Sequence, residues 1–349
     1  MPASCLNAIA RVKVSINQLI TITRKPAEKN CPLHLGNKLG SGGNFPKRAF
    51  AFLLCLIPFL TCFAIISCAS APDSRESGQL KTFQTVENIQ PQWEVFAGGI
   101  DFFHGKVTSV RIEFWALRVD LSAQNLRIVV RGGATAQDGG TLSAKVSSFA
   151  RDNKLIAGIN AVPFDVVSSK EGQAIKNSGL VVSDGKLISP LNPRYDVLVF
   201  FRDGSKEQKL KAAIVEQSSI YTTVNIENAV GGFHQILKNG QTTERTLVSD
   251  VRHPRSAAGI SSDTRYLYFL VIDGRRIGSV GGTEKETALL LRSLGSWDGL
   301  NFDGGGSSAL VLRFPDGKIK AVNTPIHRFP GQERAVAGCI GISLSMAPE

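Results

Sequence analysis

The sequence predicts an α+β fold, a mixed and strand-rich single domain with a few packed helices. Short apolar runs bounded by Gly, Asn and Asp recur along most of the chain, and most have the length of a strand. Only two segments have the periodicity and end signals of helices. With 43% hydrophobic and 20% charged residues among 349, the composition is that of a globular chain and not of a disordered one.

The chain begins with a basic leader, residues 1–48, in which eight Lys and Arg stand against Glu28 alone. This leader carries a net charge of +7, so the remainder holds only +4 of the total +11. A start codon assigned too early or a long cytoplasmic lead-in would explain the leader. Because so little positive charge remains after residue 48, we expect no nucleic acid as a partner.

Residues 49–68 form an apolar segment that is typical of an export signal. The nineteen residues from Ala49 to Ser67 carry no charge, follow two basic residues and precede Cys68. An aliphatic residue and a small one before Cys68 match the bacterial lipoprotein pattern, in which this cysteine is lipidated. We therefore expect an exported, membrane-anchored lipoprotein that faces the periplasm or the cell surface. The alternatives are an uncleaved N-terminal anchor helix, an ordinary signal peptide or a buried core helix.

Residues 69–90 are polar and poor in aromatic side chains, which favours a tether between the membrane and a domain at residues 91–349. Cys339 is the only cysteine after residue 68. A single cysteine among small and aliphatic residues indicates a buried thiol, so we expect no disulfide scaffold.

Within the domain, two segments predict helices. Ser143 to Asp152 has one apolar face, and Thr283 to Leu294 begins with a T-x-x-E capping box and ends before Gly295. Eight apolar runs predict strands. These runs are Val110 to Leu121, Leu126 to Val130, Leu155 to Ile159, Gly179 to Val182, Val197 to Phe201, Leu267 to Ile272, Leu300 to Phe302 and Ala309 to Phe314.

The stretch NFDGGGSSALV, Asn301 to Val311, places a carboxylate and three glycines directly after a predicted strand. Alternate strand residues share a face, so Asn301 and Asp303 are expected to project together from the end of this strand. The glycines allow positive φ and close approach of a ligand to backbone N–H groups. A tight turn in which Asp303 caps its own backbone explains the same residues, so this stretch alone leaves turn and ligand site open.

Two arginines precede predicted core strands. Arg255 stands before Ala257 to Ile260, and Arg334 before Ala335 to Ile342. Guanidinium groups in such places can bind a phosphate or a carboxylate bidentately. A solvated surface position is the alternative for either arginine. Glu286 has a local explanation as well, because Glu is favoured at this position of a capping box.

Several common catalytic motifs are absent from the sequence: H-E-x-x-H, C-x-x-C, G-x-S-x-G and the Walker loop. The five histidines have no metal-ligand spacing. We therefore expect no cofactor, and neither a zinc nor a serine hydrolase. A hard divalent cation held by Asn301, Asp303 and Asp273 stays an alternative, because oxygen ligands need no fixed spacing.

A series of segments resembles the phosphodiester glycosidase family, in order and spacing, over roughly residues 93 to 345. The segment LNFDGGGSSALV is the most specific of them. The segments are IAGINAVPFD (156–165), AVGGFHQILKNGQ (229–241), HPRSAAGISSD (253–263), LYFLVIDGR (267–275), Glu286 with TALLLRSLGSWDGLNFDGGGSSALV (287–311), VNTP (322–325) and ERAVAGCIGI (333–342).

The resemblance implies hydrolysis of the bond between the anomeric carbon of a sugar and a phosphodiester, with a glycan or sugar phosphate as substrate. Arg255 and Arg334 match the family's H-P-R and E-R positions and are expected to bind phosphate. Asp303 is the candidate base or stabiliser of an oxocarbenium-like centre, with Glu286 or Glu333 as the second carboxylate. The other expected substrate-binding residues are Asn160, Asn301, Gly304, Gly305, Gly306, Ser307 and Asp273.

Two departures from the family pattern concern the pocket. The chain has Asn160-Ala161-Val162 where the family commonly has Asn-Gly-Gly, and Phe233 where a further glycine is frequent. Side chains at Ala161, Val162 and Phe233 are therefore expected to narrow the pocket. Two other functions stay open: a catalytically impaired surface glycan-binding or envelope-structural protein on the same fold, and a metal-dependent phosphodiesterase.

Overall fold

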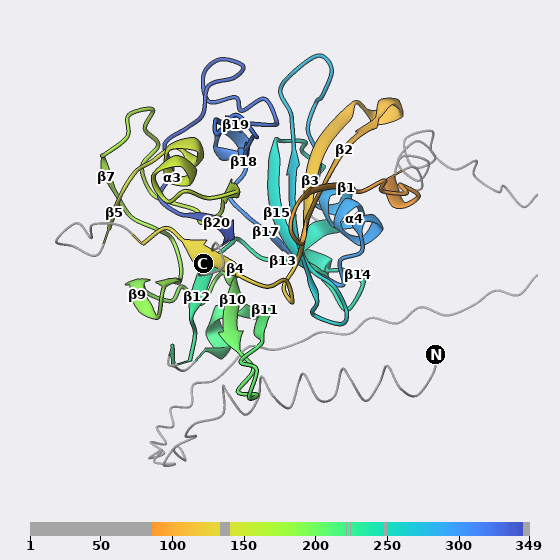
Figure 1. The fold of residues 1–349 in the computed structure, drawn as a ribbon. Helices are drawn as coiled ribbons and strands as arrows, with labels where there is room; N and C mark the ends of the chain where they lie inside the picture. Colours follow the sequence, from red (N-terminus) through yellow and green to blue (C-terminus); the bar gives the residue numbers. More distant parts are fainter. Residues whose placement is uncertain (1–85, 133–139, 221, 224, 248–249, 345–349) are drawn as a thin grey trace, which may run out of the picture.

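The computed structural model describes residues 86–344, except for 133–139, 221, 224 and 248–249. This part of the chain is rich in strands, which form three larger antiparallel sheets and one of two strands, and it contains two α-helices. Figure 1 shows one helix beside each of two sheets that face each other. The predicted α+β class is confirmed.

The largest sheet has eight strands in the order β1-β2-β3-β16-β15-β17-β13-β14. In its centre β15 pairs with β16 in antiparallel orientation. Arg255, the first residue of β15, lies opposite Ile272. The strands are β1 (Glu94–Ala97), β2 (Ile100–Val107), β3 (Ile112–Asp120), β13 (Gln235–Lys238), β14 (Gln241–Thr242), β15 (Arg255–Ile260), β16 (Tyr266–Ile272) and β17 (Asp298–Asn301).

Two five-stranded sheets follow the orders β11-β10-β12-β8-β9 and β19-β18-β6-β20-β4, and β5 pairs with β7 alone. These strands are β4 (Leu126–Val130), β5 (Thr141–Leu142), β6 (Ala157–Asn160), β7 (Ala174–Ile175), β8 (Val181–Ser183), β9 (Lys186–Ser189), β10 (Asp196–Arg202), β11 (Leu210–Glu216), β12 (Asn228–Gly231), β18 (Leu310–Arg313), β19 (Ile319–Ala321) and β20 (Cys339–Leu344). Short 3₁₀ turns are η1 (Thr108–Val110), η2 (Gln217–Ser219), η3 (Glu244–Leu247) and η4 (Gly305–Ser307). Each of the eight predicted strands overlaps an observed one.

Helix α4 (Glu284–Leu294) has the predicted capping box and terminator. Glu286 N donates to Thr283 Oγ1 at 3.0 Å, and Thr283 N donates to the Glu286 carboxylate at 2.8 Å. Gly295 ends the helix with a φ of 112°, a conformation that glycine adopts without strain. These contacts fix the N-terminal end of α4, from which Glu284 projects.

Helix α3 (Val146–Asp152) begins three residues later than predicted. Ser143 N donates to Gln173 O at 2.7 Å, and Ala144 forms an antiparallel bridge with Val336. These extended pairings hold the first residues of the predicted helix outside it.

The core lies in layers. One apolar cluster fills the space between the eight-stranded sheet and the two five-stranded sheets, with Phe200, Phe269 and Phe302 at its centre. A second cluster joins the outer face of the eight-stranded sheet to α4, and a third joins α3 to the sheet that contains β6. The fully buried Val86 belongs to the second cluster, so the packed domain extends into the predicted tether.

The predicted glycine turn carries the chain from the eight-stranded sheet to a five-stranded one. Strand β17 ends at Asn301, and β18 begins at Leu310 in the other sheet. Phe302 N still donates a hydrogen bond to Ser256 O in the eight-stranded sheet. Asp303 N instead donates to Ala161 O, beside the five-stranded sheet, at 2.8 Å. The prediction that Asn301 and Asp303 share one strand face is therefore wrong, because Asp303 lies in the crossing.

The predicted leader, export segment and Cys68, with most of the tether, lie outside the described residues. They stay predictions. Within the described part of the chain, no helix is both long and apolar enough to span a membrane.

Candidate active site

The glycine turn is shaped by close contacts with the protein itself. A Cβ on Gly304 would lie 2.8 Å from Pro254 O, and a Cβ on Gly306 would lie 2.4 Å from Arg334 Nη2. Gly305 has a φ of 61°, and a Cβ there would lie 3.1 Å from Arg275 Nη2. Three glycines therefore allow two arginines and the segment before β15 to approach the turn.

The buried amide of Asn160 holds the turn in place. Its Nδ2 donates to Asp303 O at 2.6 Å, while its Oδ1 accepts from Ser256 Oγ at 2.7 Å and from Ala309 N at 3.1 Å. The side chain is fully buried at the end of β6. One amide thus joins β6, β15 and both ends of the glycine turn.

Asp303 is the partly accessible carboxylate at this crossing. Burial raises its pKa to about 6, although a hydrogen bond from Ser307, the charge of Arg334 and the Gly304 N–H act to lower the pKa. At neutral pH Asp303 is therefore mostly ionised but can still accept a proton. This is the property that a general base needs.

Arg334 lies against the turn and next to Asp303. Its Nη1 donates to Ser307 Oγ at 3.2 Å and its Nε to His327 Nδ1 at 3.1 Å. Burial, and then the charges of Arg334 and Arg328, lower the pKa of His327 and favour the neutral imidazole that accepts this hydrogen bond. The guanidinium keeps further N–H groups on Nη1 and Nη2 for another acceptor.

Arg275 is an exposed residue that sequence analysis missed. It follows Gly274 with a φ of 58°, an uncommon conformation for a non-glycine residue. In the described part of the chain, no acceptor or acidic group pairs with its guanidinium. Burial lowers the pKa values of Arg334 and His253 most strongly, and the charge of Arg275 lowers both further. Arg275 and Arg334 therefore give this face of the turn a positive potential that suits an anion.

Arg255 is held on the other side of the turn. Its Nε donates to Gly282 O at 2.9 Å, Nη2 to Val251 O at 3.2 Å and Nη1 to the Glu284 carboxylate at 3.4 Å. The side chain is largely buried, and two of its five N–H groups remain for a ligand. The structure thus places Arg255 beside Gly304 but uses most of its hydrogen-bonding capacity within the protein.

Glu284 is a second carboxylate in this region that the sequence did not indicate. It accepts from His234 Nε2 at 2.8 Å and from Asn301 Nδ2 at 3.3 Å. Burial acts to raise its pKa, but His234 and Arg255 together hold the pKa below its ordinary value. Asn301 is buried, and its Oδ1 accepts no hydrogen bond from any described residue.

The two carboxylates proposed as partners of Asp303 have structural contacts elsewhere. Glu286 is fully buried in the capping box and pairs with Arg252. Glu333 accepts from Ser147 N at 3.0 Å and thereby caps the N-terminus of α3. Neither has a side-chain hydrogen bond or ion pair with Asp303 in the described part of the chain.

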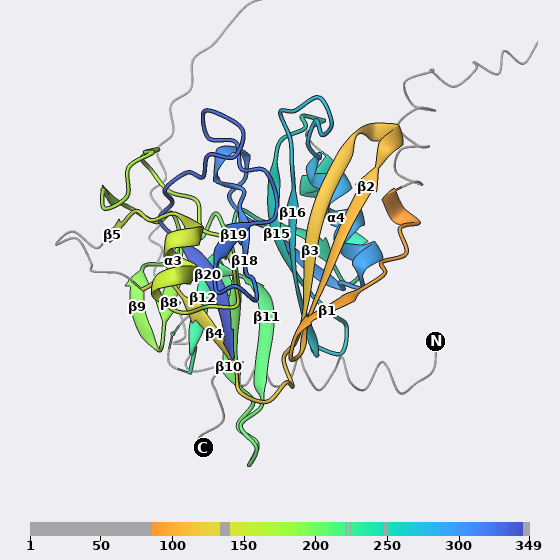
Figure 2. The ribbon, with the colours of Figure 1, turned by 45° about the horizontal axis from the view of Figure 1, so that its top comes forward.

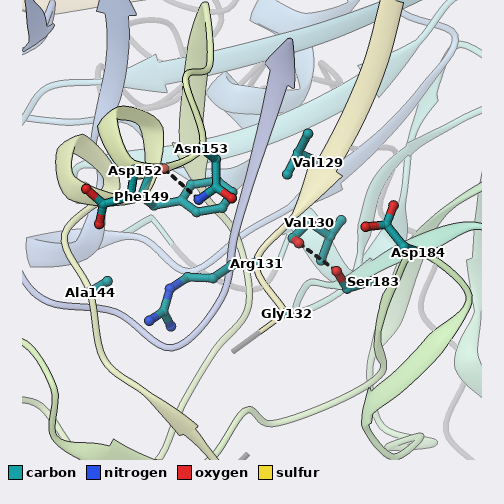
Figure 3. Close-up of a pocket in the computed structure, with 10 residues that line it drawn as sticks. All are labelled: Val129, Val130, Arg131, Gly132, Ala144, Phe149, Asp152, Asn153, Ser183 and Asp184. Carbon is teal, nitrogen blue, oxygen red and sulfur yellow. Dashed lines mark hydrogen bonds between the residues drawn. The ribbon is translucent and has the colours of Figure 1, made fainter. Parts of the chain in front are cut away.

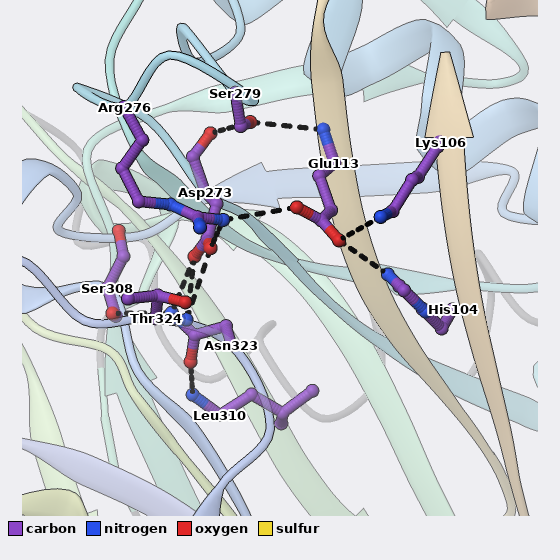
Figure 4. A network of polar contacts seen from close by, with 10 residues as sticks. All are labelled: His104, Lys106, Glu113, Asp273, Arg276, Ser279, Ser308, Leu310, Asn323 and Thr324. Carbon is purple, nitrogen blue, oxygen red and sulfur yellow. Dashed lines mark hydrogen bonds and ion pairs between the residues drawn. The ribbon is translucent and has the colours of Figure 1, made fainter. Parts of the chain in front are cut away.

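Asp273 is buried in a polar network behind the turn (Figure 4). Its carboxylate pairs with Arg276 and accepts from Asn323 Nδ2 at 3.0 Å and Thr324 N at 3.1 Å. Asn323 Oδ1 in turn accepts from Leu310 N at 2.9 Å. Burial raises the pKa of Asp273 against the effects of these partners. Asp273 therefore positions the segment after the glycines and the loop that carries Arg275.

Of the three residues expected to narrow the pocket, two are buried and one is partly exposed. Ala161 and Val162 are buried in the core, and Val162 packs against Gly338. Phe233 is partly exposed and packs edge to face against Tyr195. The replacement of two glycines by Ala161 and Val162 thus fills the interior, and only Phe233 has an exposed surface.

No group of three His, Cys, Asp or Glu side chains within the described ranges is arranged to hold a metal ion. The candidate cation ligand Asp273 has both oxygens in hydrogen bonds or an ion pair. The absence of a resident cofactor stays a prediction.

A hollow of about 370 Å³ lies apart from the turn, against α3, β4 and β8 (Figure 3). It shares no lining residue with the groups described above. It is lined by Val129, Val130, Arg131, Gly132, Ala144, Phe149, Asp152, Asn153, Ser183 and Asp184.

Comparison with known proteins gives one family and a common fold. A family model described as phosphodiester glycosidase matches residues 153–343, more than half of the chain. The catalytic domain of zebrafish N-acetylglucosamine-1-phosphodiester alpha-N-acetylglucosaminidase, auto-inhibited by its pro-peptide, is similar with a TM-score of 0.51 and 18% identity, over 73% of this chain and 88% of that one. A hypothetical protein from Synechocystis gives a TM-score of 0.51 and 14% identity, over 74% of this chain and 64% of that one. At these identities the structural likeness shows the fold. The comparison with curated proteins gives no significant match.

Replacing Asp303 by Asn is expected to stabilise the protein at neutral pH. The folded-state pKa of about 6 lies above the ordinary value of 3.8, so ionisation above pH 6 opposes folding. Asp303→Asn should raise the free energy of unfolding by roughly 1 to 3 kcal/mol at pH 7.5. The gain should shrink strongly as the pH falls from 7.5 to 4, because the folded state is then protonated while the unfolded carboxyl, with its ordinary pKa of 3.8, is only partly ionised. Denaturant unfolding at both pH values measures this, and a variant that is less stable at pH 7.5 would contradict it.

Proposed function

Because the chain belongs to the phosphodiester glycosidase family, we propose that it hydrolyses the glycosidic C–O bond of a sugar-1-phosphodiester. The observation that carries this proposal is the meeting of Asp303, Arg275 and Arg334 at one glycine turn. A base with a pKa of about 6 then lies at the same turn as two guanidinium groups that can hold a phosphate.

Phosphate binding is the role proposed for the two arginines. A phosphodiester carries one negative charge, and two arginines at the turn neutralise it when Asp303 is ionised. The Arg275 guanidinium has no partner among the described residues, and Arg334 keeps free N–H groups. Ser307, within reach of both Asp303 and Arg334, adds a hydroxyl to this face.

In the proposed reaction a water oxygen attacks the anomeric carbon. The C1–O bond breaks and its electron pair stays on the phosphate oxygen, while Asp303 accepts the proton that the water loses. The products are the free sugar and a phosphomonoester, which takes up a proton in the solvent. Because a phosphomonoester is a good leaving group, the arginines stabilise most of the charge that develops on the phosphate in the transition state.

Sugar binding is the role proposed for the groups on the Arg255 side of the turn. The Glu284 carboxylate and the unused Asn301 Oδ1 are both acceptors for hydroxyl groups. Glu284 takes the place that the sequence gave to Glu286 or Glu333 as second carboxylate. We assign no chemical step to those two residues, which cap helices.

The proposed setting is the cell envelope. The apolar segment before Cys68 supports export and lipid attachment, and a glycan phosphate of the envelope or the surroundings would then be the substrate. The domain itself would act outside the cytoplasm.

Asp303→Asn is expected to lower kcat for a nitrophenyl sugar-1-phosphodiester by about 10²- to 10⁴-fold, because a positioned base contributes that much. The wild type should lose activity as the pH falls through about 6, since protonation of Asp303 removes the base. Release of nitrophenyl phosphate over pH 4.5 to 8 measures both effects. A folded wild type that turns over no diester in a panel of sugars would overturn the proposal. Glycan binding that survives in both proteins would then favour a binding function.

Arg275→Gln is expected to reduce kcat/KM by roughly 10²-fold, because a charge-assisted contact to phosphate is lost in a partly dehydrated site. The matched control is Arg265→Gln, an exposed arginine whose partner is Asp120 on the β3 side of the first sheet. The control should retain wild-type kinetics. Equal losses in the two variants would refute a specific role for Arg275.

A further inference from the structure

The largest exposed apolar side chains are concentrated on the loops that carry the site. Of eight large hydrophobic residues that are exposed in the described part of the chain, five lie on these loops. Isolated exposed hydrophobic residues are common, but their accumulation around a polar site indicates an apolar partner. They are Val166 (54% exposed), Val167 (56%), Val251 (56%), Ile277 (92%) and Phe329 (70%).

Two of these residues adjoin Arg255 and Arg275. The Val251 carbonyl accepts from Arg255 Nη2 at 3.2 Å. Ile277 follows Arg275 by two positions in the same loop. Their side chains are exposed although their backbones lie beside the proposed site.

Two others adjoin Arg334. Phe329 follows His327 by two positions, and His327 accepts from Arg334. Val167 precedes the residue that forms an antiparallel bridge with Ala335, the neighbour of Arg334. Each of the three arginines at the turn therefore has an exposed apolar residue close to it along the chain or through one contact. We call Val166, Val167, Val251, Ile277 and Phe329 the apolar rim.

The figures place the three longest loops of the rim at one end of the molecule. The loop between β6 and β7, the loop between β16 and α4 and the blue loop after β19 all reach the upper end in Figure 1, and they stay together in Figure 2. The loops that carry Val166, Val167, Ile277 and Phe329 thus lie at the same end of the molecule.

Positive charge surrounded by apolar side chains is complementary to an amphiphile with an anionic head. We propose that the phosphate of the substrate carries a hydrocarbon chain, so that the substrate is a sugar joined through a phosphodiester to a lipid alcohol. The sugar and phosphate lie at the turn, and the chain lies on the apolar rim. This inference rests on the proposed function and names the leaving group.

The length of the hydrocarbon provides a direct test. A fully buried methylene strengthens binding by about fourfold, and contact on an open rim gives less. For methyl, butyl and octyl esters of one sugar-1-phosphate below their micellar concentrations, kcat/KM should rise about 10- to 100-fold from methyl to octyl. The double variant Ile277→Ser with Phe329→Ser should reduce this rise to less than about threefold and leave the methyl ester unaffected.

A matched control uses two exposed hydrophobic residues outside the rim. Val95 is 84% exposed on β1 and Leu187 is 55% exposed on β9. Val95→Ser with Leu187→Ser should keep the full dependence on chain length. Thermal unfolding of both double variants shows whether they fold alike.

The outcomes separate this inference from the proposed function. Turnover of the methyl ester with no gain for longer chains would overturn the lipid substrate and leave the glycosidase proposal standing. Calorimetric binding of the same esters to Asp303→Asn gives a readout that needs no turnover, and affinities that do not vary with chain length would also overturn it. Binding to anionic vesicles without substrate, lost in the rim variant, would assign the rim to a bilayer surface instead and would contradict the inference.

Discussion

The site depends on one buried amide. Asn160, at the end of β6, contacts Ser256 Oγ in β15 and both Asp303 O and Ala309 N in the connection between β17 and β18. A fully buried amide must have its hydrogen bonds satisfied inside the protein, so the two sheets can meet in only one arrangement here. The chain crosses between the sheets at this point. The glycine turn, together with Asp303, is the segment in which the chain passes from one sheet to the other.

The same crossing explains the chemical character of Asp303. A residue between two packed sheets loses water, and this loss raises its pKa to about 6. The three glycines leave room for Arg275 and Arg334, and the charge of Arg334 acts to lower the pKa of the carboxyl group. The sequence suggested that glycine serves the approach of a ligand. In the structure it serves the approach of two arginines, Arg275 and Arg334, to the turn.

Elements of the structure that depend on neighbouring residues in the sequence could be predicted. The strands and the capping box at Thr283 follow from neighbouring residues, whose spacing is visible in sequence. Strand β2 was not predicted, because its apolar residues are interrupted by His104, Gly105 and Lys106. Arg275 and the His234–Glu284 pair were missed for another reason. Arg275 lies beside Gly305, and His234 pairs with Glu284, across long separations in the chain that only the sheet order closes.

The central claim, cleavage at carbon, is tested most directly by hydrolysis of an active diester in ¹⁸O-labelled water. Mass spectrometry of both products at early times shows which one receives the water oxygen. The phosphomonoester gives the more reliable result, because its oxygens do not exchange with the solvent. The account predicts an unlabelled phosphomonoester and a labelled sugar. Label in the phosphomonoester, with activity that a chelator removes, would contradict it and would identify a metal-dependent phosphodiesterase.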